Sequence, residues 1–178
     1  MENRNARVVG SMRKFVSLLM LASFCCAPEA VATNPLAPNF ALRDINGEEY
    51  RLSEHRGEII VLNFWATWCN PCMAELPHLN RIDKNYEDRD VNVVAISIDA
   101  ARHISKVKAY VKSRKYAFTT LIDRDTTVVS QYNPSKAIPY TVVIDRQGRI
   151  VHFHTGYANG DEDIYIDLIE EMLENESR

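Results

Sequence analysis

The sequence is poor in cysteine and has no excess of positive charge, and each shortage argues against a class of protein. Only four of the 178 residues are cysteine, and of these only Cys69 and Cys72 lie beyond residue 32. The chain is therefore no disulfide-dense scaffold, and it is long enough to bury a core without staples. Its formal net charge of −3 at pH 7 argues against nucleic acid as a partner.

The sequence also lacks an apolar run of the about 20 residues that a membrane-spanning helix needs. The uncharged apolar run at residues 15–27 is shorter, and a small-residue A-x-A site follows at residues 30–32. Four basic residues precede the run: Arg4, Arg7, Arg13 and Lys14. This pattern is typical of a signal peptide. We expect a signal peptide at residues 1–32, with an uncleaved membrane anchor as the alternative, and a periplasmic or otherwise extracytoplasmic domain at residues 33–178.

Hydrophobic periodicity predicts an α/β domain with a mixed sheet. An Asn46–Gly47 turn indicates an early β-hairpin, and a nearly unbroken apolar run indicates a strand buried on both faces. The expected elements are a hairpin at 40–52, strands at 59–66 and 91–99, a helix from residue 71, a basic helix at 104–114, a short strand or loop at 118–123, two strands within 140–157 and a closing helix after 161. The closing helix is expected to bury Ile164, Leu168, Ile169 and Met172.

The C-x-x-C pair in "FWATWCNPCMAELP" has three readings: half of a metal site, a structural staple or a redox-active dithiol. A structural zinc site needs four ligands, and His152 and His154, the remaining candidates, are expected on the solvent-facing side of a strand. A disulfide that closes four residues is worth only about 2 kcal/mol in the loop-entropy model. Neither the metal nor the staple reading is favoured.

Position favours the redox reading. Cys69 is expected where a buried strand ends and a helix begins, with Cys72 in the first helical turn. Unpaired N–H groups and the positive end of the helix dipole stabilise a thiolate there. Pro71 fits the same turn, because a first-turn residue needs no N–H. We expect Cys69 to be the exposed attacking thiol and Cys72 the shielded resolving thiol.

Several motifs together resemble the TlpA/ResA-like thiol-disulfide oxidoreductases of the thioredoxin superfamily. The motifs are "APNF", "LNFWATWCNPCMAELP" with Pro77, "VVAISID" and "IPYTVVID". The resemblance covers essentially residues 36–173. It implies a thioredoxin fold in which helices flank a mixed central sheet, with an N-terminal β-hairpin extension.

The resemblance also implies roles for individual residues. Ile138 and Pro139 match a cis-proline loop that binds substrate beside the dithiol, and Trp68 matches a tryptophan that borders it. Glu75 matches an acid that tunes the cysteine pKa values or moves a proton at Cys72. An ordinary first-turn helix acid is the alternative for Glu75.

The chain departs from related patterns at two positions. Thioredoxin has a buried aspartate where this chain has Asn63, so a proton relay falls to Glu75 or water. Relatives dedicated to cytochrome c assembly have a glutamate directly after the cis-proline, where this chain has Tyr140.

We expect an exported, monomeric reductant of disulfides in envelope proteins, possible substrates including apocytochrome c, that requires no metal or other cofactor. A membrane thiol-disulfide transducer is the expected electron donor. The alternatives are a peroxiredoxin-like thiol peroxidase and a non-catalytic thioredoxin-fold binding module. A peroxidase of that kind has a T-x-x pattern before its reactive cysteine, whereas Thr67 lies two residues before Cys69.

Overall fold

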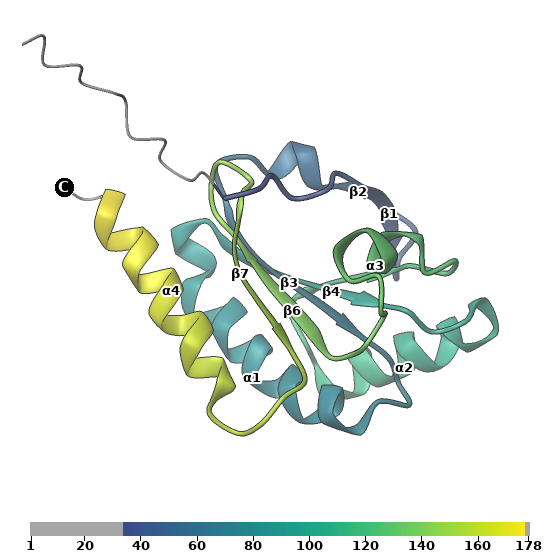
Figure 1. The fold of residues 1–178 in the computed structure, drawn as a ribbon. Helices are drawn as coiled ribbons and strands as arrows, with labels where there is room; N and C mark the ends of the chain where they lie inside the picture. The colour runs from purple at the N-terminus through teal and green to yellow at the C-terminus, as the bar shows by residue number, and fades with distance from the viewer. Residues whose placement is uncertain (1–33, 177–178) are drawn as a thin grey trace, which may run out of the picture. The chain divides into compact units, whose positions relative to one another are not determined.

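A computed structural model describes residues 34–176 of the chain as a β-sheet with helices on both faces (Figure 1). The strands are β1 (Ala41–Asp44), β2 (Glu49–Arg51), β3 (Ile59–Trp65), β4 (Val91–Ser97), β5 (Thr119–Ile122), β6 (Tyr140–Ile144) and β7 (Ile150–Thr155). The helices are α1 (Asn70–Tyr86), α2 (Ile104–Arg114), α3 (Thr127–Tyr132) and α4 (Asp161–Glu176). Short 3-10 turns lie at Leu52–His55, Glu87–Arg89 and Ala101–His103. The expected signal peptide lies outside the described residues.

The sheet is mixed, as the sequence predicts. Its strand order is β2-β1-β5-β4-β3-β6-β7, with parallel pairing from β3 through β4 to β5 and antiparallel pairing elsewhere. β3 lies between β4 and β6, and all seven of its residues are buried. Burial on both faces explains why its sequence is an apolar run without alternation.

Two hydrophobic clusters form the core, one on each face of the sheet. Residues of α1, α2 and α4 pack against β3 and β4 in the first cluster, which includes Cys69, Cys72 and Tyr165. Residues of the β1–β2 hairpin and α3 pack with β3 and β6 in the second. Figure 1 shows α3 and the hairpin across the sheet from α1 and α4. The face of the sheet that carries the first cluster is therefore the face on which α1 and the cysteine pair lie.

The N-terminal hairpin extends the sheet beyond β5. β1 pairs with β2 and with β5, both in antiparallel register. In the connecting turn, Gly47 has a φ of 99°, a left-handed conformation that favours glycine. The Asp44 carboxylate accepts hydrogen bonds from the backbone N–H groups of Asn46 and Glu48, each at 2.8 Å. The predicted hairpin is confirmed.

Helix α3 is absent from the sequence prediction. It has only six residues, too few for a helical period to emerge, and β-branched Thr127, Val128 and Val129 give it weak intrinsic preference for the helix. It forms because the Asp123 carboxylate accepts hydrogen bonds from the N–H groups of Thr127 at 3.0 Å and Val129 at 2.9 Å. A tertiary packing requirement and one capping acid thus create a helix that periodicity does not reveal.

The prediction for the buried face of α4 was partly wrong. Ile169 is buried, but Ile164 is exposed and Tyr165 is buried in its place. The sequence prediction favoured aliphatic residues over tyrosine for the core. Tyr165 is accommodated there because its hydroxyl has a buried hydrogen-bond partner in α1.

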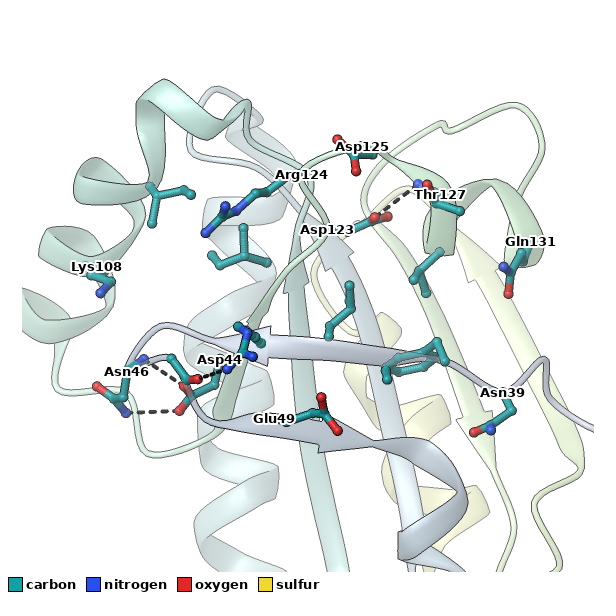
Figure 2. Close-up of a pocket in the computed structure, with 18 residues that line it drawn as sticks. Asn39, Asp44, Asn46, Glu49, Lys108, Asp123, Arg124, Asp125, Thr127 and Gln131 are labelled. Carbon is teal, nitrogen blue, oxygen red and sulfur yellow. Dashed lines mark hydrogen bonds between the residues drawn. The ribbon is translucent and has the colours of Figure 1, made fainter.

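A hollow of about 600 Å³ lies between the β1–β2 hairpin, α2 and the start of α3 (Figure 2). None of its lining residues belongs to the dithiol segment 64–77. Asp44 and Asp123, which line it, accept the hydrogen bonds that build the hairpin turn and α3. We therefore interpret this hollow as a junction between elements.

Replacing Phe40 with alanine tests whether the hairpin is part of the core. Phe40 is buried, and its ring centroid lies 6.2 Å from those of Tyr50 and Tyr132. The cavity left behind should lower the free energy of unfolding by about 3 kcal/mol, measured by urea denaturation. Leu36→Ala, at a position that is 59% exposed, should change it by less than about 0.5 kcal/mol. Equal effects of the two substitutions would contradict this packing.

Candidate active site

The two cysteines lie where β3 gives way to α1, as the sequence predicts. Cys69 is the N-cap residue of α1, and Cys72 lies in the first turn and forms a disulfide with it. The backbone N–H of Cys72 donates a hydrogen bond to the Cys69 Sγ at 3.2 Å. Pro71 lies between them, where a helix needs no N–H donor. The N–H of Cys72 is thus directed at the Cys69 sulfur, and this helix N-terminus is suited to stabilise a thiolate after reduction.

The two sulfur-bearing residues differ in access to solvent. Cys69 retains 6% exposure and Cys72 none. Attack on a large disulfide partner requires access, whereas attack on a neighbouring sulfur within the same turn does not. Cys69 is thus buried in the oxidised protein rather than exposed as expected, although it is the less completely buried of the two. The attacking and resolving roles remain predictions.

A buried aspartate fixes the loop that leads into the dithiol. The Asp99 carboxylate accepts hydrogen bonds from the N–H of Thr67 at 2.8 Å, from the Thr67 hydroxyl at 2.7 Å and from the Ser97 hydroxyl at 3.0 Å. Asp99 follows β4, so parallel pairing places it beside the end of β3. This contact was not predicted from the sequence. The available signal was the acid that ends the predicted buried strand at 91–99.

Glu75 is fully buried one helical turn after Cys72, so it is no solvated first-turn acid. Three side chains donate hydrogen bonds to its carboxylate: the Asn63 amide at 3.0 Å, the Thr141 hydroxyl at 2.8 Å and the Tyr165 hydroxyl at 3.1 Å. Asn63 also donates to the Thr141 hydroxyl at 2.8 Å. Because residues three apart are neighbours on a helix, this polar cluster lies beside Cys72.

Burial raises the pKa of Glu75 from 4.5 to about 7, because a carboxylate loses its hydration there. The hydrogen bonds from Thr141, Tyr165 and Asn63 and the charge of His154 oppose this rise. The carboxyl group is thereby poised near neutrality, where a group exchanges protons most readily. Such a pKa suits a proton acceptor for a neighbouring thiol.

The expected substrate-binding residues lie at the same end of the sheet as the dithiol. The Ile138–Pro139 peptide is cis, as the resemblance implies, and it precedes β6, whose Tyr140 pairs with Phe64 near the end of β3. Ile138 packs against the cluster that contains both cysteines. Trp68 is 62% exposed next to Cys69 and is available to a partner, whereas Trp65 is buried.

The prediction that His152 and His154 face solvent from a strand was wrong. Both are half-buried, and they pair across β6–β7 with Val143 and Thr141, which face α1 and α4. Cross-strand neighbours share a face of the sheet. The sequence prediction failed because it did not anticipate that α4 covers this edge of the sheet.

Within residues 34–176, no group of three or more histidine, cysteine, aspartate or glutamate side chains is arranged to hold a metal ion. In that same part of the chain, no helix is long and apolar enough to span a membrane.

A profile of the AhpC/TSA family matches residues 34–153. The chain belongs to the AhpC/TSA family. Within this family it is similar to the thiol-disulfide oxidoreductase ResA of Geobacillus kaustophilus, with 33% identity over 153 residues that cover 82% of this chain and 86% of the relative. It is a thiol-disulfide oxidoreductase of the ResA type.

Solved structures confirm that the chain has a thioredoxin-like fold. A candidate thiol:disulfide interchange protein DsbE from Chlorobium tepidum aligns with a TM-score of 0.72 and 28% identity, over 79% of this chain and 96% of the other. The exposed lipoprotein thioredoxin of Streptococcus pneumoniae aligns with a TM-score of 0.63 and 27% identity, over 75% and 99%.

Asp99→Ala should loosen the loop at Thr67 and lower the stability of the protein. The substitution leaves the buried donors of Thr67 and Ser97 without an acceptor, which should lower the free energy of unfolding by about 3 kcal/mol in urea denaturation. Asp125→Ala, at an exposed position, is the control and should change it little. An Asp99→Ala protein as stable as the control would contradict the anchoring role.

Glu75 should make the stability of the oxidised protein fall as pH rises. Its pKa is about 7 when folded and near 4.5 when unfolded, so the folded state holds the proton more tightly between these values. Stability is then highest below pH 4.5 and is lost progressively up to about pH 7, by about 3 kcal/mol.

Glu75→Gln should remove this loss, because glutamine does not ionise. Urea denaturation at several pH values between 4 and 8 measures the effect, with the exposed Glu171→Gln as the matched control. A Glu75→Gln protein whose stability depends on pH as the unsubstituted protein's does would show that Glu75 does not titrate in this range.

Proposed function

We propose that this thiol-disulfide oxidoreductase reduces disulfides in other proteins outside the cytoplasm, through Cys69 and Cys72. The observation that carries the proposal is the position of the dithiol: Cys69 caps α1 with slight exposure, while Cys72 is buried beside the polar cluster around Glu75. A thiolate-stabilising helix terminus and a proton acceptor thus flank one pair of sulfurs.

The proposed reaction has two steps. The Cys69 thiolate attacks one sulfur of the partner's disulfide; a mixed disulfide forms and one partner thiolate leaves. Cys72 then gives its proton to the Glu75 carboxylate and attacks the Cys69 sulfur, and the second partner thiolate leaves. Two electrons have passed to the partner, both partner thiolates take up protons, and the Cys69–Cys72 disulfide remains.

The residues around the dithiol support substrate binding and the reducing direction. Trp68 offers an exposed ring beside Cys69, and the backbone at Ile138–Pro139 would lie along an extended substrate segment. No histidine lies between the cysteines to stabilise the thiolate further and make the pair strongly oxidising. A measured reduction potential well above that of glutathione would overturn the reducing direction.

The proposed location rests on the N-terminal sequence and on one relative. Residues 1–32 have the pattern of a signal peptide or an uncleaved anchor, and the similar streptococcal protein is described as an exposed lipoprotein. A reductant in an oxidising compartment needs electrons in every cycle. The proposed donor is a membrane thiol-disulfide transducer, and the proposed substrates are oxidised envelope proteins, apocytochrome c among them.

The peroxidase alternative is not favoured. Thr67 lies two residues before Cys69 rather than three, and its hydroxyl donates to Asp99. The non-catalytic alternative is not favoured either, because the similar Geobacillus protein is named as an oxidoreductase.

Cys72→Ala should trap the substrate on Cys69. Without the resolving thiol, the mixed disulfide cannot be released by attack within the protein, so a disulfide-containing peptide or envelope protein should stay attached. Non-reducing electrophoresis and mass spectrometry detect the adduct, which a reductant should dissolve.

The matched control is the double variant that also carries Cys69→Ser, which should form no adduct. Adducts formed equally well by this control would show that Cys69 is not the attacking thiol. Unchanged disulfide reduction by Cys69→Ser alone would support a binding role in place of catalysis.

A further inference from the structure

We propose that His154, held by Asp161, controls the ionisation of Glu75 and is thereby a positioning residue for proton transfer at the dithiol. The inference rests on the proposed role of Glu75 as the acceptor of the Cys72 proton. It adds a solvent-accessible partner to a carboxyl group that has no exposure of its own.

Sheet register brings His154 to the buried carboxyl. His154 of β7 pairs directly with Thr141 of β6, and the Thr141 hydroxyl donates to Glu75 Oε1 at 2.8 Å. Side chains of a directly opposed antiparallel pair share a face, with Cβ atoms about 5 Å apart. His154 and Glu75 therefore both lie next to Thr141. The His154 side chain is 31% exposed, so it can exchange protons with water.

The first residue of α4 holds the imidazole. The His154 Nε2 lies 3.1 Å from the Asp161 Oδ2, and this oxygen also accepts a hydrogen bond from the Ala158 N–H at 2.7 Å. A neighbouring carboxylate attracts the imidazole when it carries a positive charge. His154, held in this way, lies beside Thr141 and close to Glu75.

The other groups that face Glu75 are neutral near pH 7. They are Asn63 of β3, Thr141 of β6, Tyr165 of α4 and, further out, Tyr157. Burial raises the pKa of Glu75, and hydrogen bonds together with the charge of His154 lower it. His154 is the cation that acts on Glu75 among the described residues.

The groups around His154 are also defined. Asp161 faces it from α4, and His152 lies two residues away on the same strand. Burial lowers the pKa of His152, and the charge of His154 lowers it further, so the neutral form of His152 is favoured. The next acid along α4, Glu162, is engaged elsewhere: it lies against His78 and accepts a hydrogen bond from the Tyr157 hydroxyl at 2.8 Å.

In the proposed reaction, the charge of His154 affects the transfer of the Cys72 proton to Glu75. Imidazolium at His154 keeps Glu75 as a carboxylate, the form that accepts the Cys72 proton while the Cys72 electron pair forms the bond to Cys69. Once Glu75 is protonated, His154 faces the Asp161 carboxylate alone. Because His154 acts on Glu75, the pH dependence of mixed-disulfide resolution should report the ionisation of Glu75 and its control by His154.

His154→Gln tests the proposal directly. The pKa of the Glu75 carboxyl, followed by carbon-13 NMR in the oxidised protein, should rise by about one pH unit when the charge is removed. The rate of mixed-disulfide resolution on its acidic limb should fall about tenfold at a given pH. His154→Lys, which keeps the positive charge, should restore both values.

His78→Gln is the matched control. It removes the contact between His78 and Glu162 in the first turn of α4, but it removes no charge that acts on Glu75. It should leave the titration of Glu75 unchanged. An unchanged titration in His154→Gln, or an equal shift in His78→Gln, would overturn the proposal.

The two proposals fail in distinguishable ways. The titration of Glu75 in the oxidised protein requires no turnover, so it can be read even in a protein that reduces no disulfide. Loss of the proposed function would appear as absent disulfide reduction by the unsubstituted protein. Loss of this inference would appear as normal reduction with a titration of Glu75 that ignores His154.

Discussion

The ionisable carboxyl of Glu75, enclosed without exposure beside the dithiol, is the constraint on which the site depends. Taking a carboxylate out of water is unfavourable unless donors replace the lost hydration. The chain supplies these donors from β3, β6 and α4, through Asn63, Thr141 and Tyr165. Three separate elements must therefore be in register before Glu75 can ionise near neutrality, and the chemistry of the site is tied to the completed fold.

The central strand explains how this register is achieved. β3 is buried on both faces between β4 and β6, and its end carries the chain directly into the cysteine pair. On one side, parallel pairing brings Asp99 to the loop at Thr67. On the other, antiparallel pairing brings the peptide before Tyr140 to the same edge. One strand thus aligns the loop anchor, the dithiol and the cis Ile138–Pro139 peptide, although these lie far apart in the sequence.

Features that depend on neighbouring residues could be predicted from the sequence, whereas features that depend on residues far apart in the chain could not. The hairpin at Asn46–Gly47, the buried strands and the Cys69–Cys72 pair at a helix start are written in neighbouring residues, so local pattern and the known motifs were sufficient. Helix α3 was missed because it depends on Asp123 and on packing rather than on its own period. The buried face of α4 was misplaced because Tyr165 is only suitable for the core once Glu75 is known to be its partner.

The polar cluster around Glu75 lay beyond sequence prediction for the same reason. Its members are separated by tens of residues, and each has an ordinary local explanation: Thr141 is a β-branched strand residue and Tyr165 an aromatic residue on an amphipathic helix. His154 seemed to face water because alternation along β7 shows two faces without showing which one α4 covers. A local motif can therefore specify where the dithiol lies, whereas the hydrogen-bonding surroundings of Glu75 are specified by strand register and helix packing. Substitutions in the dithiol and in these surroundings should consequently be judged by the pH dependence of disulfide reduction as well as by its rate.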